Sequence, residues 1–252
     1  MQPEADIGLP SPFVGGTLLA AWEQAAEETP LDRAVGLIAR GWPELSAADI
    51  RALHIAARDE RLLRLRAASF GPVMALFFAC RGCATAMDIA APVDRLCALL
   101  RAARDTSDLD CPGYAIRVRL ADTDDLALVD AAEDHATAQR VLLARCLQAT
   151  GEDGAPVPPE ALPDPVLRAA AAEADALHNS AEILLQLACP ACGAQHTVAL
   201  DPLYVLWREL RHAAQRLLTE VHELAWAYGW SESAILSLSP PRRQAYLAQV
   251  RQ

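Results

Sequence analysis

The sequence of 252 residues has few basic and few aromatic side chains. Lys and Arg together number 22 against 33 Asp and Glu, which gives a formal net charge of -11, and only 5% of the residues are aromatic. Binding to nucleic-acid backbones draws its affinity from clustered Lys and Arg. The charge balance therefore argues against broad nucleic-acid binding, although it leaves a local basic patch open.

Long apolar runs and targeting signals are also missing. No apolar run approaches the roughly 18 residues that a membrane-spanning helix requires, so we expect no membrane association. Residues 1–20 contain two acidic residues, three prolines and no basic stretch, which does not fit a secretory or transit peptide. We therefore expect a cytoplasmic protein whose thiols stay reduced.

The pattern of apolar residues predicts a chain that is mainly helical. Three prolines and a Gly-Gly pair indicate a flexible leader at residues 1–16. Helical spacing then covers residues 17–71. The strongest pattern runs from residue 203 to 228, with apolar side chains at alternating steps of three and four residues. Gly229 ends this long helix, and short helices follow, the last of them from Pro240.

Two short segments carry the same pair of cysteines. "FFACRGC" ends at Cys83 and "QLACPAC" ends at Cys192, and each follows an apolar run and precedes an alternating strand pattern. We therefore expect two β-hairpins whose turns are the CxxC pairs. The hairpins align without gaps, Cys80 with Cys189 and Cys83 with Cys192, which suggests pseudo-twofold pairing.

Two CxxC turns are typical of a structural zinc site. Thiolates from Cys80, Cys83, Cys189 and Cys192 would complete a tetrahedron around Zn²⁺ and saturate the ion. Unligated dithiols and redox-active dithiols are the alternatives, but a redox CxxC opens a helix in a βαβ setting, whereas a strand pattern follows each pair here. His196 could replace a ligand, although we expect it on the strand surface.

These patterns predict an α+β fold that is mainly helical, with a small antiparallel, zinc-ribbon-like β core made of the two pseudo-repeated hairpins. The core would span residues 72–203 and include a third strand at Tyr114–Leu120, a helix over residues 124–149 and a proline-rich loop at 151–165. Residues 204–252 would form the long helix and the short helices. We expect one compact domain.

No catalytic motif is evident in the sequence. It contains no GxSxG, no phosphate-binding loop and no paired acids at a catalytic spacing. The acidic residues in segment 122–125 fit the start of a helix as well as a cation site. Cys97, Cys111 and Cys146 fall outside the repeat, and we expect them to be small buried thiols. A zinc hydrolase would need an open coordination position. We expect no enzyme and no small-molecule substrate.

Several stretches resemble a known protein family. They are "ARDERLLRLRAASFG", the two CxxC hairpins, "RVRLADTDDLALVDA" and, most specifically, "EVHELAWAYGWSESAILSLSPPRRQAYL". Together they are similar to bacteriophage baseplate proteins grouped with the T-even-type baseplate hub assembly chaperones, which have relatives in contractile injection systems. The resemblance covers residues 17–252. It implies a non-enzymatic structural or assembly protein, present in the bacterial or phage-infected cytoplasm or in the assembled particle, with baseplate or hub proteins as partners.

The C-terminal segment offers a candidate partner surface. Tryptophan, tyrosine and arginine dominate interface hot spots, and this segment carries Trp226, Tyr228, Trp230, Arg242, Arg243 and Tyr246. Alternatively, the tryptophans pack the last helix onto the long one. The alternative function is a zinc-ribbon adaptor in transcription or RNA handling, which needs a basic face that the acidic charge balance disfavours.

Overall fold

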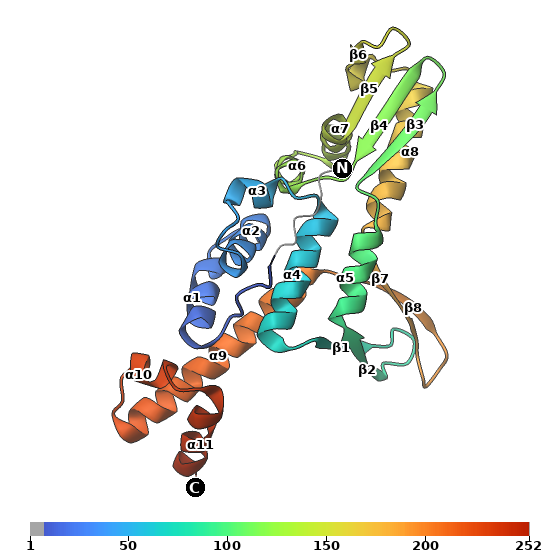
Figure 1. The fold of residues 1–252 in the computed structure, drawn as a ribbon. Helices are drawn as coiled ribbons and strands as arrows, with labels where there is room; N and C mark the ends of the chain where they lie inside the picture. The colour runs from blue at the N-terminus through green and yellow to red at the C-terminus, as the bar shows by residue number, and fades with distance from the viewer. Residues whose placement is uncertain (1–7, 252) are drawn as a thin grey trace.

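The computed structural model describes residues 8–251, so the prediction of a flexible leader at residues 1–7 lies outside the described part (Figure 1). The chain has the predicted fold class, a mainly helical α+β fold with small antiparallel sheets. The first helices are α1 (Gly15–Ala26), α2 (Pro30–Gly41), α3 (Ala47–Arg51) and α4 (Ile55–Phe70). The hairpin β1 (Val73–Ala79) and β2 (Ala86–Pro92) follows, and then α5 (Val93–Ala102).

An insert with its own sheet separates the two hairpins. It contains β3 (Thr106–Cys111), β4 (Tyr114–Arg119), α6 (Thr123–Asp130), α7 (His135–Cys146), β5 (Leu147–Gly151), β6 (Pro156–Val157), a 3-10 turn η1 (Pro159–Ala161) and α8 (Asp164–Ser180). The second hairpin consists of β7 (Ile183–Ala188) and β8 (Gln195–Leu200). The chain ends with α9 (Pro202–Tyr228), α10 (Glu232–Leu236) and α11 (Pro240–Val250).

Helix α9 connects the N-terminal helices to the two C-terminal helices. Its N-terminal half packs into a cluster of buried side chains with α1, α2 and α4, in which Leu37, Leu62 and Leu206 are fully buried. Its C-terminal half extends away from these helices and carries α10 and α11, while the insert lies at the opposite end of the molecule (Figure 1). The predicted long helix is therefore confirmed, and the amphipathic pattern of α9 reflects this burial.

The segment before α1 is packed against the helices. Phe13 is buried, and the indole N–H of Trp42 donates a hydrogen bond to the carbonyl oxygen of Gly8 at 2.8 Å. Helix α1 begins at Gly15. The prediction of a leader through residue 16 is therefore wrong for residues 8–16, because Phe13 joins the helical core and α1 already begins at Gly15.

The helical pattern predicted over residues 17–71 is interrupted between α3 and α4. Ser46 caps α3, since its hydroxyl accepts a hydrogen bond from the Asp49 N–H at 3.1 Å. The break falls at His54, whose backbone forms an isolated bridge with Asp122. The His54 ring nitrogen then accepts from the N–H of Ala57 and caps α4. A contact distant in sequence thus interrupts a continuous helical pattern.

The strand predicted at Tyr114–Leu120 is present as β4, but it does not join the hairpins. In residues 8–251 it lies in a four-stranded sheet in the order β3-β4-β5-β6, and each CxxC hairpin forms a separate two-stranded sheet. The helix predicted over residues 124–149 consists of α6 and α7 and then gives way to β5. The proline-rich loop at 151–165 includes β6 and η1. The single β core expected at residues 72–203 is therefore divided.

The inner faces of the hairpins enter the main hydrophobic core. Met74 and Leu76 of β1 and Ile183 of β7 are buried together with side chains of α5 and of the insert, including α8. This packing holds both CxxC turns at the same side of the molecule. Among the described residues, no helix is both long and apolar enough to cross a bilayer.

Candidate metal centre

The two CxxC turns meet, as the sequence predicts. The Sγ atoms of Cys80, Cys83, Cys189 and Cys192 all lie within 4.8 Å of one another. Two of the sulfur–sulfur separations, Cys80 to Cys192 and Cys83 to Cys189, are 3.6 Å. Each of these contacts joins one hairpin to the other. The cluster therefore links segments that the whole insert separates in sequence.

The spacing of the sulfurs fits a tetrahedral metal site. With metal–sulfur bonds of about 2.3 Å, the edge of an S₄ tetrahedron is roughly 3.8 Å, close to the 3.6 Å between Cys80 and Cys192 and between Cys83 and Cys189. A disulfide would bring two sulfurs to about 2.05 Å, and all four cysteines are free. The four cysteines could thus hold a metal ion, and four thiolates leave no open position on a tetrahedral ion.

Both hairpins fold into the same turn around their first cysteine. The N–H of Ala84 donates to the carbonyl oxygen of Cys80 at 2.8 Å, and the N–H of Gly193 donates to that of Cys189 at 2.9 Å. Ala84 and Gly193 occupy the same position of the repeat, and their φ angles are 60° and 73°. This left-handed conformation suits glycine and strains alanine. The first hairpin therefore carries backbone strain that the second one avoids.

Exchanging these two residue types is expected to have opposite effects. Ala84→Gly should raise the free energy of unfolding by about 0.5–1 kcal/mol because it relieves the strain, whereas Gly193→Ala should lower it by about 1 kcal/mol. Denaturant unfolding of the two variants and the parent measures both values. A shift of the same sign in the two variants would contradict the equivalence of the two turns.

The cluster has a buried half and an exposed half. Cys80 and Cys189 are 3% and 2% exposed, whereas Cys83 and Cys192 are exposed to solvent. The first cysteine of each pair therefore lies beneath the turn, and the second lies at the surface. This arrangement gives an ion a path from solvent and shields its inner side.

The pKa values of two thiols in the cluster are shifted in opposite directions. Hydrogen bonds with the hydroxyl and the backbone N–H of Thr85 lower the pKa of Cys83 to about 6. The backbone N–H of Ala194 also lowers the pKa of Cys192, but its contacts with the other cluster sulfurs outweigh this and raise the pKa to about 12. Because these thiols lie so close together, the ionisation of one opposes the ionisation of the next. A cation would be needed to hold four thiolates together.

His196 lies against the cysteine cluster. The sequence instead predicts it on the surface of the strand. It belongs to β8 and is half-buried, and its Nε2 is 3.2 Å from the Sγ of Cys80 in the opposite hairpin. The only sequence signal was its spacing of four residues after Cys192. That spacing does not indicate whether the imidazole ring of His196 contacts a cysteine of its own hairpin or of the other one.

The predicted partner surface contains both packed and exposed residues. Tyr228 and Trp230 stack with ring centroids 4.7 Å apart, and Tyr246 of α11 meets the Trp230 ring edge-on at 4.9 Å. Arg243 is buried, and its Nε donates to a carboxylate oxygen of Glu220 at 2.6 Å. The prediction that Arg243 lies at the surface is therefore wrong, because this ion pair fastens α11 to α9.

Trp226 differs from the other aromatic residues of this segment. Its side chain is 87% exposed although it stands on the well-formed helix α9. Arg242 is also exposed. Packing of α11 onto α9 therefore accounts for Trp230 and Tyr246 but gives no reason for a tryptophan at position 226. Trp226 and Arg242 remain available to a partner.

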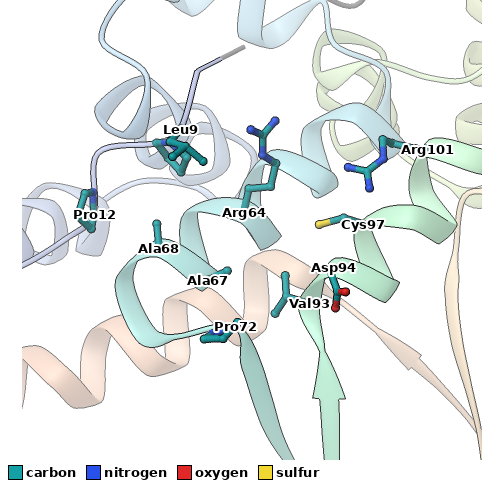
Figure 2. Close-up of a pocket in the computed structure, with 11 residues that line it drawn as sticks. Leu9, Pro12, Arg64, Ala67, Ala68, Pro72, Val93, Asp94, Cys97 and Arg101 are labelled. Carbon is teal, nitrogen blue, oxygen red and sulfur yellow. The ribbon is translucent and has the colours of Figure 1, made fainter. Parts of the chain in front are cut away.

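The cysteines outside the cluster include two buried thiols. Burial raises the pKa of Cys97 to about 11 and that of Cys146 to about 12, while Cys111 is half-buried. Cys97 lies on α5 beside an apolar groove of about 570 Å³, which residues 9–12, α4 and α5 enclose (Figure 2). Because its thiol stays protonated at neutral pH, Cys97 gives this groove no reactive thiolate.

Comparison with models of known protein families, with curated proteins and with solved structures finds no match to this chain.

Proposed function

We propose that the chain is a non-enzymatic structural or assembly protein of a contractile phage tail or injection-system baseplate, which binds baseplate or hub proteins and holds a structural Zn²⁺. It would act in the bacterial or phage-infected cytoplasm or within the particle. The proposal combines the resemblance of residues 17–252 to baseplate proteins with one structural observation, the closed set of four cysteines.

The donor set favours a structural role for the ion. Four cysteines are the typical ligands of structural zinc, whereas a catalytic zinc keeps one position for water or substrate. Each hairpin supplies two ligands, so the ion would clamp the start of the insert to its end. The ion would thereby fix the relative positions of α5, α8 and α9, which follow or precede the hairpins. A scaffold for protein binding requires such rigidity.

Trp226 and Arg242 favour binding to another protein. Tryptophan and arginine are the residue types most enriched at interface hot spots, and here Trp226 of α9 and Arg242 of α11 are both exposed. The acidic charge balance favours a protein partner over nucleic acid.

Co-expression with baseplate and hub proteins of the same particle tests the proposal. We expect at least one of them to co-purify with the chain and Trp226→Ser to weaken this binding by at least about 30-fold, the loss typical of a hot-spot residue. Titration calorimetry of the purified pair measures the affinity.

Phe77→Ser is the matched control for Trp226→Ser. Phe77 is also a strongly exposed aromatic residue, at 69%, but it lies on β1 and not on α9. Its replacement should leave the affinity unchanged. The proposal is wrong if no baseplate or hub protein binds the parent chain.

A further inference from the structure

The two halves of the cysteine cluster differ at one position of the repeat. The seventh residue after the first cysteine is Met87 in the first hairpin and His196 in the second. Met87 is buried against Cys80 and Cys189 in a small apolar cluster. His196 instead brings a ring nitrogen to 3.2 Å from the Sγ of Cys80. At this position of the repeat, only the second hairpin therefore brings a polar side chain to the cluster.

The direction of this hydrogen bond follows from the chemistry of a bound cysteine. A metal ion takes the thiolate form of Cys80, which has no proton to donate. The contact can then exist only if Nε2 of His196 carries the proton and donates it toward the sulfur. The backbone N–H of Gly82 also donates to this sulfur, at 3.4 Å. Cys80 would thus accept two hydrogen bonds in addition to binding the ion.

The histidine does not replace a cysteine in the coordination shell. The group of donor atoms that all lie within 4.8 Å of one another consists of the four sulfurs, without His196. Those four sulfurs already complete a tetrahedron. His196 therefore lies beside one ligand and outside the set.

We propose that His196 is a positioning residue of the metal centre, whose Nε2–H donates a hydrogen bond to the Cys80 thiolate and strengthens zinc binding. This inference rests on the proposed zinc site. Four thiolates on one Zn²⁺ carry a net charge of -2, and a donor aimed at one sulfur disperses part of it. Because His196 stands on β8 and Cys80 follows β1, the same bond holds one hairpin against the other. Removing such a partner of a metal ligand typically lowers metal affinity about 10- to 100-fold.

Zinc affinity of the full chain tests the inference through three substitutions. His196→Phe removes the donor but keeps a ring, His196→Gln keeps an N–H at a similar distance, and Met87→Leu changes the equivalent position of the first hairpin. We expect about 10- to 100-fold weaker zinc binding for His196→Phe, recovery of most of the affinity in His196→Gln, and a change below about threefold for Met87→Leu. Competition with a chromogenic zinc chelator gives the affinities, and circular dichroism checks that each variant is folded.

The absorption spectrum of the cobalt(II)-substituted protein provides a second readout. It reports the atoms that bind the metal, which a loss of packing alone would not change. We expect parent and His196→Phe to keep the absorption of a four-thiolate site, with a shift in the sulfur-to-metal charge-transfer band where the hydrogen bond is lost. A parent spectrum typical of three sulfurs and one nitrogen would overturn the inference, because His196 would then be a ligand. Equal zinc affinity of His196→Phe and parent would also overturn it while leaving the zinc site in place. A parent chain without bound metal would overturn both.

Discussion

A chain with both Cys80 and Cys189 replaced by serine is expected to lose its zinc and most of its stability. These are the two buried cysteines of the proposed zinc site, so the variant removes the inner half of its four sulfurs. Zinc contributes on the order of 10 kcal/mol to folding of small metal-binding units, while a whole domain is stable by only about 5–15 kcal/mol. Metal analysis of the purified variant and its thermal unfolding, followed by circular dichroism, measure the two losses.

The loss of structure should begin in the hairpins. A two-stranded hairpin is marginally stable by itself, and the hairpins form two separate sheets. The buried cluster that joins α1, α2, α4 and α9 shares no residue with the main core that receives β1 and β7. Amide hydrogen exchange should therefore accelerate first in β1, β2, β7 and β8. A strong chelator added to the parent chain should reproduce this pattern.

Cys111→Ser is the matched control for the double variant. It makes the same chemical change in a half-buried cysteine at the end of β3, outside the cluster. We expect full zinc content and a melting temperature close to that of the parent. If the double variant also kept zinc and melted with the parent, the cluster would not be a metal site.

The hairpins were predictable because their signals are local and repeated. Each combines an apolar strand pattern, a CxxC turn and a second strand pattern, and the two copies align residue by residue. Pseudo-twofold pairing was enough to predict that the four cysteines meet. The long helix α9 was predictable for a similar reason, since its apolar pattern is sustained through residue 228 and Gly229, at a φ of 66°, ends it.

The insert was not predictable because its strands depend on their neighbours. Strand β3 has the sequence TSDLDC, which is too polar to be recognised as a strand, and Asp108 pairs there with Arg117 of β4. The predicted helical pattern extends through residue 149, but β4 offers residues 147–151 an edge to pair with, so they form β5. The roles of Arg243 and His196 likewise depend on Glu220 and Cys80, which are distant in sequence.

Asp125 holds the insert together through two arginines. Its carboxylate is fully buried, accepts hydrogen bonds from Arg119 of β4 at 2.7 Å and Arg145 of α7 at 2.8 Å, and also accepts one from the N–H of Asp122 at 3.1 Å. Thus one side chain on α6 connects the sheet to the end of α7. The acidic cluster seen in the sequence is therefore, at Asp125, a helix cap and an ion-pair centre.

Asp125→Asn is expected to lower the free energy of unfolding by about 3 kcal/mol. Breaking a buried ion pair costs about 3–5 kcal/mol, and the partial exposure of Arg119 and Arg145 places this case at the lower end. Asp108→Asn is the matched control, since Asp108 pairs with Arg117 on the same sheet but both side chains are exposed. The control should lose less than about 1 kcal/mol. Denaturant unfolding at pH 7 measures both variants, and equal losses would contradict the role of burial.

The stabilising effect of Asp125 should disappear in acid. Burial raises the pKa of Asp125, but hydrogen bonds from Arg119, the Asp122 N–H and Arg145 outweigh this and lower the pKa from 3.8 to about 2. A carboxylate with a lowered pKa stabilises the fold fully above its unfolded value and loses this effect as the pH falls toward the folded value. The difference in unfolding free energy between parent and Asp125→Asn should therefore be constant from pH 7 to about pH 5 and shrink between pH 4 and 2. Zinc release in acid affects parent and variant alike, so it cancels in this difference. A difference that stays constant down to pH 2.5 would show that the charge of Asp125 is not what stabilises the insert.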